Sequence, residues 1–147
     1  SLPIGTKVAV DGPYGVCTPE IADGRKVLFV VGGVGIAPAR AMLEVLPPSA
    51  EPVVLYRAHS AAELVHHDEL VELAARRNGR VLTLVGPSAS LAVRDPFSAH
   101  TLRQAVPDVA ERVAVLCGPD RLLSAARTGL RHAGVDSGDL HFEHSWW

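Results

Sequence analysis

The stretch GGVGIAP, from Gly32 to Pro38, combines residue types suited to binding a phosphate group. Its three glycines allow a sharp turn and let a ligand approach the backbone, because no Cβ is in the way. Pro38 suits the first turn of a helix, where its missing N–H would have no partner. An apolar run, a glycine turn and a helix start together direct unpaired N–H groups at one spot, which favours an anion. The candidate binding residues are Gly32, Gly33, Val34, Gly35, Ile36 and Pro38. A tight turn without a ligand is the alternative interpretation.

A second turn of this kind, Cys117-Gly118-Pro119-Asp120, also follows an apolar run. Ligands of parallel α/β sheets bind at the carboxyl ends of the strands, so both turns could face one dinucleotide. Cys117 alone would more simply be a small buried hydrophobic residue. Cys17 and Cys117 lack metal-ligand spacing, and the sequence assigns no disulfide between them.

The composition and the residue spacing argue against several other functions. The net charge is −2 and no Lys/Arg cluster stands out, which argues against nucleic-acid binding. His66 and His67 diverge by about 100° on a helix, so we expect no metal site there. No apolar run approaches the roughly 20 residues that span a bilayer, and no secretory signal is present.

Five short apolar runs separated by helical patterns predict a doubly wound, five-stranded parallel α/β sheet flanked by helices. The expected strands are Val27–Val31, Val53–Tyr56, Val81–Val85, Val113–Leu116 and Leu140–Phe142. The expected helices carry the stripes Met42/Leu43/Leu46, Leu70/Leu73/Ala74 and Leu123/Ala126/Leu130/Ala133, with a short helix at Thr101–Val106. Ser60 and Glu63 form a capping-box pattern before the second helix. The loop Gly86–Ser98 is long enough to suggest a functional role.

Residues 1–22 do not follow the strand–helix alternation of the rest of the chain. Lys7–Val10 is strand-like, yet four residues of strand cannot form a sheet alone. We therefore expect residues 1–22 to be the end of another domain with its linker, and residues 23–147 to be the nucleotide-binding domain.

The ordered motifs resemble one family, the ferredoxin–NADP reductase superfamily. The motifs GGVGIAP, YRAHSAAEL (Tyr56–Leu64) and LCGPD (Leu116–Asp120) are similar to its NAD(P)H-binding domain. GPYG (Gly12–Gly15) resembles the last piece of its flavin-binding barrel, and FEHSWW its terminal tail. The segments DELVELAARRNGRV and AVPDVAERVAVLCGP most resemble bacterial ferric-reductase-like members.

The resemblance implies an oxidoreductase that passes hydride from NAD(P)H to FAD, with electrons leaving toward a haem domain, iron or an iron–sulfur protein. It places Cys117 and Gly118 beside the nicotinamide, with Pro119 and Asp120 as further cofactor-binding residues, and implies Cys117 and Glu143 as the catalytic residues. Arg57 and Ser60 lie near the adenosine ribose, and Glu143 and the terminal aromatics, Trp147 among them, near the flavin. It also implies a flavin domain in cis and a location on the cytoplasmic side, with a full-length protein that is possibly membrane-integral.

NADPH is the expected nucleotide, with NADH possible. The second strand ends in Tyr56-Arg57-Ala58, without an acidic residue to bind a free 2′-hydroxyl. Two positions depart from the family pattern: Gly86-Pro87-Ser88 replaces an Arg of many NADP-using relatives, and Ser145 replaces a tail Phe. The reductase component of an oxygenase and a non-catalytic NAD(P)H-sensing module are the alternative functions.

Overall fold

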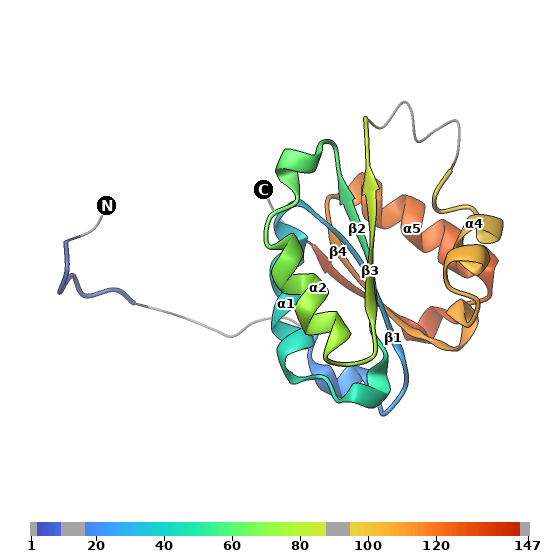
Figure 1. The fold of residues 1–147 in the computed structure, drawn as a ribbon, viewed down its shortest axis with the longest axis horizontal. Coiled ribbons are helices and arrows are strands. Elements are labelled where there is room, and N and C mark those ends of the chain that lie inside the picture. Colours follow the sequence, from blue (N-terminus) through green and yellow to red (C-terminus); the bar gives the residue numbers. More distant parts are fainter. Residues whose placement is uncertain (1–2, 10–16, 88–94, 145–147) are drawn as a thin grey trace.

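The computed structural model describes residues 3–9, 17–87 and 95–144, which contain a five-stranded, all-parallel sheet (Figure 1). The strand order is β3-β2-β1-β4-β5. The strands are β1 Val27–Gly32, β2 Val53–Ala58, β3 Arg80–Val85, β4 Val113–Gly118 and β5 Leu140–His144. The predicted fold class and all five strands are confirmed.

Burial explains why the central strands are recognisable in the sequence. Every residue of β1 and β4 is buried, so both strands are apolar on both faces. Val30 of β1 pairs with Leu55 of β2 on one side and Leu116 of β4 on the other. The edge strand β3 contains only exposed and half-buried residues.

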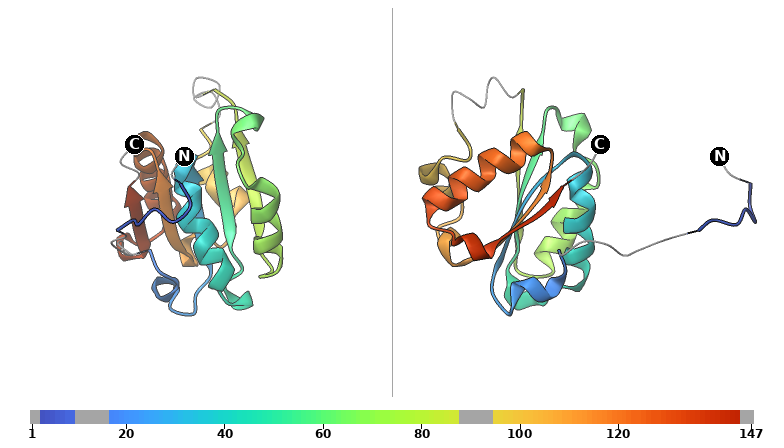
Figure 2. Two further views of the ribbon diagram at one scale, coloured as in Figure 1. Left: turned by 90° about the vertical axis from the view of Figure 1, so that its left-hand side faces the viewer. Right: turned by 180° about the vertical axis from the view of Figure 1, so that it is seen from behind.

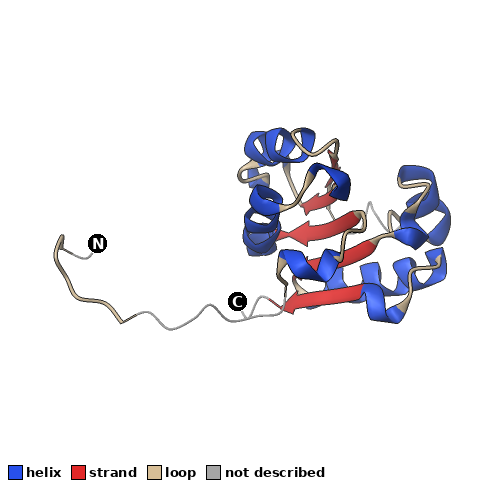
Figure 3. Cartoon of the chain, turned by 90° about the horizontal axis from the view of Figure 1, so that it is seen from below, coloured by secondary structure: helices blue, strands red, loops and turns tan. Residues whose placement is uncertain are grey.

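In the described part of the chain, four α-helices cover the two faces of the sheet, so the fold has three layers (Figures 1 and 3). The helices are α1 Ile36–Val45, α2 His67–Ala75, α4 Ala99–Ala105 and α5 Asp120–Ala133. Short 3₁₀ turns are Pro19–Ala22, Gly33–Gly35, Pro48–Ala50, Ala61–Glu63, Val109–Glu111 and Ser137–Asp139. The rear view shows α5 lying across the sheet on the face opposite α1 (Figure 2).

Each face of the sheet has its own apolar cluster. Under α1 and α2, Phe29, Tyr56 and Leu70 are among the buried residues. Under α4 and α5, Leu55, Leu102 and Leu130 are buried. The two layers therefore hold the sheet from both sides and fix the strand ends that carry the predicted site.

The amino edge of the sheet carries a charge network that the sequence did not reveal. Arg112 is 3% exposed, and its guanidinium donates to both Asp108 carboxylate oxygens at 2.8 and 3.0 Å. Its Nη1 also donates to the carbonyl oxygens of Val27 and Glu51. Lys26 pairs with Glu51 at 2.6 Å and with Asp108 at 3.4 Å. This network joins the starts of β1 and β4.

Residues 7–9 are exposed and unpaired among the described residues, so the assignment of residues 1–22 to another domain stays a prediction. Two expectations about the second helix need correction. The backbone of Ser60 begins only the 3₁₀ turn Ala61–Glu63, and its side chain accepts no capping hydrogen bond. Helix α2 starts at His67, after His66 in the left-handed conformation. The loop Gly86–Ser98 lies partly outside the described residues, so its expected role stays a prediction.

Candidate functional site

The two glycine turns lie side by side at the carboxyl edge of the sheet. β1 and β4 are neighbours, and Val31 pairs with Cys117 one residue before each strand ends. From β1 the chain moves outward to β2 and β3, then crosses back to β4 and β5. This reversal of strand order makes the β1–β4 edge the topological switch point, where ligands of such sheets bind. The prediction that the two turns face one site is consistent with this geometry.

Gly35 is required by the protein itself at this edge. A Cβ on Gly35 would overlap the carbonyl group of Cys117 and lie 2.7 Å from the Gly118 nitrogen. Gly35 and the following residue Ile36 are buried. Gly35 therefore brings the β1–α1 turn against the end of β4, which is a different role from the sequence prediction of open access for a phosphate.

Gly33 is the open glycine of the turn. It has a φ of +56°, and a Cβ placed there would meet no atom within 4 Å. Its neighbour Val34 is 58% exposed. Gly33 and Val34 therefore present accessible backbone at the switch point.

Leu122 supports both turns from the α5 side, a contact that the sequence did not reveal. A Cβ on Gly32 would lie 2.7 Å from Leu122 Cδ2, and one on Gly118 would lie 3.2 Å from it. Gly118 has a φ of +151°, and its Cβ would also lie 3.0 Å from the Gly32 oxygen. The two strand ends are thus packed backbone to backbone.

The first turns of α1 and α5 both begin at this edge but differ in charge. The first turn of α1 contains Pro38 and no acidic residue. The first turn of α5 contains Asp120, whose carboxylate would repel a phosphate. An anion is therefore better placed at the start of α1.

Cys117 and Glu143 occupy paired positions on β4 and β5, as two adjacent residues of the predicted site. Cys117 is buried and Glu143 half-buried. Cys17, which the sequence left unassigned, is half-buried and packs against the apolar cluster that contains Cys117. The Cys117 thiol lowers the pKa of Cys17, whereas the Cys17 thiol and burial raise the pKa of Cys117.

Arg57, at the end of β2, has a structural role. Its Nη1 donates to the Leu84 carbonyl at 3.2 Å and its Nη2 to the Gly86 carbonyl at 2.5 Å. The guanidinium therefore ties β2 to the end of β3. Two of its five N–H donors are used in this way, so the geometry leaves donors for a ligand.

Ser60 lies in an exposed turn with an acidic neighbour. Its hydroxyl donates to Glu63 Oε1 at 3.3 Å, and the His59 backbone N–H donates to Glu63 Oε2 at 3.1 Å. The Tyr56 hydroxyl lies 3.3 and 3.2 Å from the carbonyl oxygens of Glu63 and Val65, which holds the turn against β2. A carboxylate therefore does stand close to the end of β2, although the sequence of the strand itself contains none.

Trp147 and the GPYG motif (Gly12–Gly15) of the predicted site lie outside the residues that the structure describes. Pro119 is the exposed N-cap residue of α5.

Within the described ranges, no group of three or more His, Cys, Asp or Glu side chains is placed to hold a metal ion. The helices described include none that is long and apolar enough to cross a membrane.

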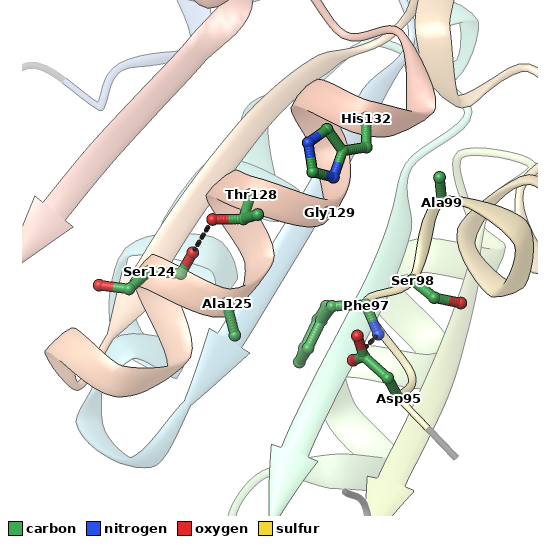
Figure 4. A pocket seen from close by; sticks show the side chains of 9 residues that line it. All are labelled: Asp95, Phe97, Ser98, Ala99, Ser124, Ala125, Thr128, Gly129 and His132. Atoms are coloured by element: carbon green, nitrogen blue, oxygen red, sulfur yellow. Dashed lines mark hydrogen bonds between the residues drawn. The ribbon is translucent and has the colours of Figure 1, made fainter. Parts of the chain in front are cut away.

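A groove of about 530 Å³ lies elsewhere, between α5 and the segment that leads into α4 (Figure 4). Its polar groups are largely satisfied by local hydrogen bonds. Asp95 accepts from the Phe97 backbone N–H at 2.9 Å, and the Thr128 hydroxyl donates to the Ser124 carbonyl at 3.0 Å. Nothing in this groove indicates a ligand, so the switch point remains the candidate site.

The fold and the position of the two glycine turns are those of a doubly wound, dinucleotide-binding type of domain. Comparisons with known proteins narrow this class. No family model matches the sequence. The chain is similar to the glycine betaine monooxygenase reductase subunit of Pseudomonas aeruginosa, at 28% identity over 151 residues, 97% of this chain and 41% of that protein. It is also similar to ferredoxin–NADP reductase B of Sorangium cellulosum, at 31% identity over 154 residues, 95% of this chain and 62% of that protein.

A solved structure shows the same fold. The FAD/NAD-binding domain of nitric oxide dioxygenase from Vibrio cholerae superposes with a TM-score of 0.67 at 22% identity, covering 82% of this chain and 51% of that one. The homologues and structural neighbours are thus flavoprotein reductases of the ferredoxin–NADP reductase type, which confirms the predicted resemblance. The chain spans 41% of the length of the Pseudomonas relative.

Proposed function

We propose that this chain is the NAD(P)H-binding part of a flavin-dependent reductase. The nucleotide would bind across the carboxyl ends of β1 and β4, with its pyrophosphate over Gly33 and Val34 at the start of α1. When bound, NAD(P)H supplies a hydride that FAD accepts and passes on as single electrons. The homologues are oxidoreductases that transfer electrons from NAD(P)H through FAD, which supports this assignment.

One observation carries the proposal: the contact between the Gly35 turn and the end of β4. Because a Cβ on Gly35 would overlap the Cys117 carbonyl, the two strand ends meet without side chains between them. Beside this contact Gly33 and Val34 are exposed just before α1, while Cys117 is buried and its β5 neighbour Glu143 is half-buried. A dinucleotide needs both features, an anion site and an adjacent position for its reactive ring.

In this proposal each residue group has a separate task. The Gly32–Pro38 turn binds the pyrophosphate. Cys117, Gly118 and Pro119 line the nicotinamide position. Asp120 lies next to that position, and its carboxylate disfavours a phosphate at the start of α5. Arg57 and Ser60 border the ribose, and Glu143 lies on the flavin side with Trp147.

The flavin itself would be held by a domain in cis, with residues 1–22 as its last piece and linker. Reductase components of oxygenases are among the homologues, which favours an oxygenase or a haem or iron–sulfur protein as the electron acceptor. The ferric reductase expected from the sequence is less directly supported than this oxygenase alternative.

A pair of glycine variants tests the nucleotide site. Gly33→Asn places a side chain over the turn, and Asn tolerates the left-handed φ of +56°. Gly24→Asn is the matched control, because Gly24 has a φ of +74° and equally open space but precedes β1 at the amino edge. Calorimetric titration with NADP⁺ should show a loss of affinity of about tenfold or more for Gly33→Asn only. Equal affinities in a folded Gly33→Asn variant would overturn the assignment.

A further inference from the structure

Tyr56 connects the core of the protein to an exposed turn beside the proposed ribose position. It lies on β2, is 1% exposed and belongs to the apolar cluster under α1 and α2. Its hydroxyl lies 3.3 Å from the Glu63 carbonyl oxygen and 3.2 Å from the Val65 carbonyl oxygen, so one O–H group donates to both. A buried side chain thus holds two positions of a surface segment.

The segment that Tyr56 holds is otherwise exposed and built from local contacts. Residues 59–63 are all exposed. The 3₁₀ turn Ala61–Glu63 is closed by two backbone hydrogen bonds, from Glu63 to Ser60 and from Leu64 to Ala61, both at 3.2 Å. The side chain of Leu64 packs against the same apolar cluster as Tyr56. A segment with so few buried contacts has low local stability, so its position depends on these two anchors.

The turn carries a carboxylate next to a residue of the proposed ribose position. Glu63 Oε1 accepts from the Ser60 hydroxyl at 3.3 Å, and Glu63 Oε2 accepts from the His59 backbone N–H at 3.1 Å. These bonds fix the carboxylate relative to the turn, and Tyr56 fixes the turn relative to the sheet. A carboxylate beside the ribose accepts a hydrogen bond from a free 2′-hydroxyl and repels a 2′-phosphate.

We propose that Tyr56 is a positioning residue for nucleotide choice, because its buried hydroxyl holds the Glu63 carboxylate beside the ribose. This inference rests on the proposed function. Loss of the hydroxyl lets the turn move, and the carboxylate then spends less time at the ribose. NADPH binding should gain relative to NADH binding, whereas a general loss of stability would weaken both nucleotides alike.

Tyr56→Phe tests the proposal, since it removes the hydroxyl and keeps the ring in the core. We expect the ratio of NADPH affinity to NADH affinity, measured by calorimetric titration, to rise about threefold or more. Val54→Ala is the matched control, because Val54 is fully buried on the same strand and in the same cluster. It should lower the free energy of unfolding and leave the ratio unchanged. An unchanged ratio in Tyr56→Phe would overturn the proposal.

Combination with Glu63→Gln shows whether the effect acts through the carboxylate. Once the Glu63 charge is removed, Tyr56→Phe should no longer change the ratio, so the two substitutions should be strongly non-additive. The same change of ratio with and without the charge would exclude Glu63 as the group that Tyr56 positions.

Hydrogen exchange measured without nucleotide separates this inference from the proposed function. In Tyr56→Phe the His59 amide, which donates to Glu63, should exchange about threefold faster or more. The Gly138 amide donates to the Asp136 side chain in another 3₁₀ turn and should not change. Unchanged exchange at His59 would refute the positioning role of Tyr56. Absence of any binding of either nucleotide to the wild type would instead refute the proposed function.

Discussion

Arg57 and Glu63 place opposite charges near the end of β2, where the proposed ribose position lies. Arg57 is half-buried and held by the carbonyl groups of Leu84 and Gly86. Glu63 is held by the His59 backbone N–H and the Ser60 hydroxyl. A 2′-phosphate would be attracted by the first side chain and repelled by the second, so we expect these two residues to set the choice of nucleotide.

We predict a modest preference for NADPH over NADH, governed by these two charges. Arg57→Ala should weaken NADPH binding several-fold and NADH binding less, while Glu63→Gln should strengthen NADPH binding alone. Competitive titration of both nucleotides measures the effect, and thermal unfolding controls for the lost contacts of Arg57 with β3. Equal affinities of the wild type for the two nucleotides would contradict this prediction.

Individual contacts within the candidate site are the features that the sequence predicts least well. The glycine turns and Cys117 could be predicted because local patterns and a family resemblance mark them. Cys17 and Leu122 could not, because their contacts with the site depend on how distant segments pack. The packing role of Gly35 could not be predicted either, since its neighbour is the Cys117 carbonyl from a distant strand.

Among the elements, α5 makes an unusually close approach to the segment before α4. A Cβ on Gly129 would overlap the Phe97 carbonyl oxygen and lie 3.2 Å from Leu102 Cδ1. Arg103 of α4 reinforces this contact by donating to the carbonyl oxygens of Ala133 and His132 at the end of α5. The layer over this face of the sheet is thus built from backbone contacts.

Gly129→Ala tests this packing, because two effects oppose each other there. In an open helix position Ala would be favoured over Gly by about 1 kcal/mol. Overpacking against a backbone carbonyl costs about 1–3 kcal/mol, so we expect the free energy of unfolding to fall. Gly138→Ala, whose Cβ would lie 3.4 Å from Asp136 Oδ1, is the control and should change it by less than about 0.5 kcal/mol. Urea unfolding measures both, and a more stable Gly129→Ala variant would refute the contact.

The elements themselves were largely predictable. β1 and β4 are apolar throughout because both of their faces are buried, and their short runs could hardly be helices. The start of α2 was predicted wrongly because a capping-box pattern describes only local contacts. Here Tyr56 from the core holds the Ser60–Glu63 segment as a separate turn.

At the scale of the whole molecule, ion pairs hold the ends of the strands in place. Arg112 and Asp108, four residues apart, secure the amino edge of the sheet, and Arg25 joins the distant Asp139 at 2.6 Å before β5. The Arg112 guanidinium lowers the pKa of Asp108 below its usual 3.8, and the Arg25 guanidinium does the same for Asp139. Both pairs therefore contribute to stability only while the carboxylates are ionised.

This linkage predicts a loss of stability in acid. A carboxylate with a lowered folded-state pKa stabilises the protein above its unfolded pKa and loses that effect as the pH falls toward the folded value. We expect the free energy of unfolding to decline as the pH falls below about 4. Asp108→Asn should cost about 3 kcal/mol at neutral pH, because it leaves the buried Arg112 charge unpaired, and should reduce the acid dependence. Asp139→Asn, at a more exposed pair, should cost less than about 1 kcal/mol. An unchanged acid slope in Asp108→Asn, measured by urea unfolding, would argue against this network.

The central claim is that NAD(P)H binds at the carboxyl edge of β1 and β4, and titration of the ¹⁵N-labelled chain with NADP⁺ tests it most directly. Backbone amide signals should shift saturably at Gly33, Val34 and Gly118, where the two turns meet. Signals at the amino edge, such as those of Gly24 and Arg112, should stay unchanged. Saturable shifts confined to the amino edge, or no saturable shift at any amide, would contradict the account.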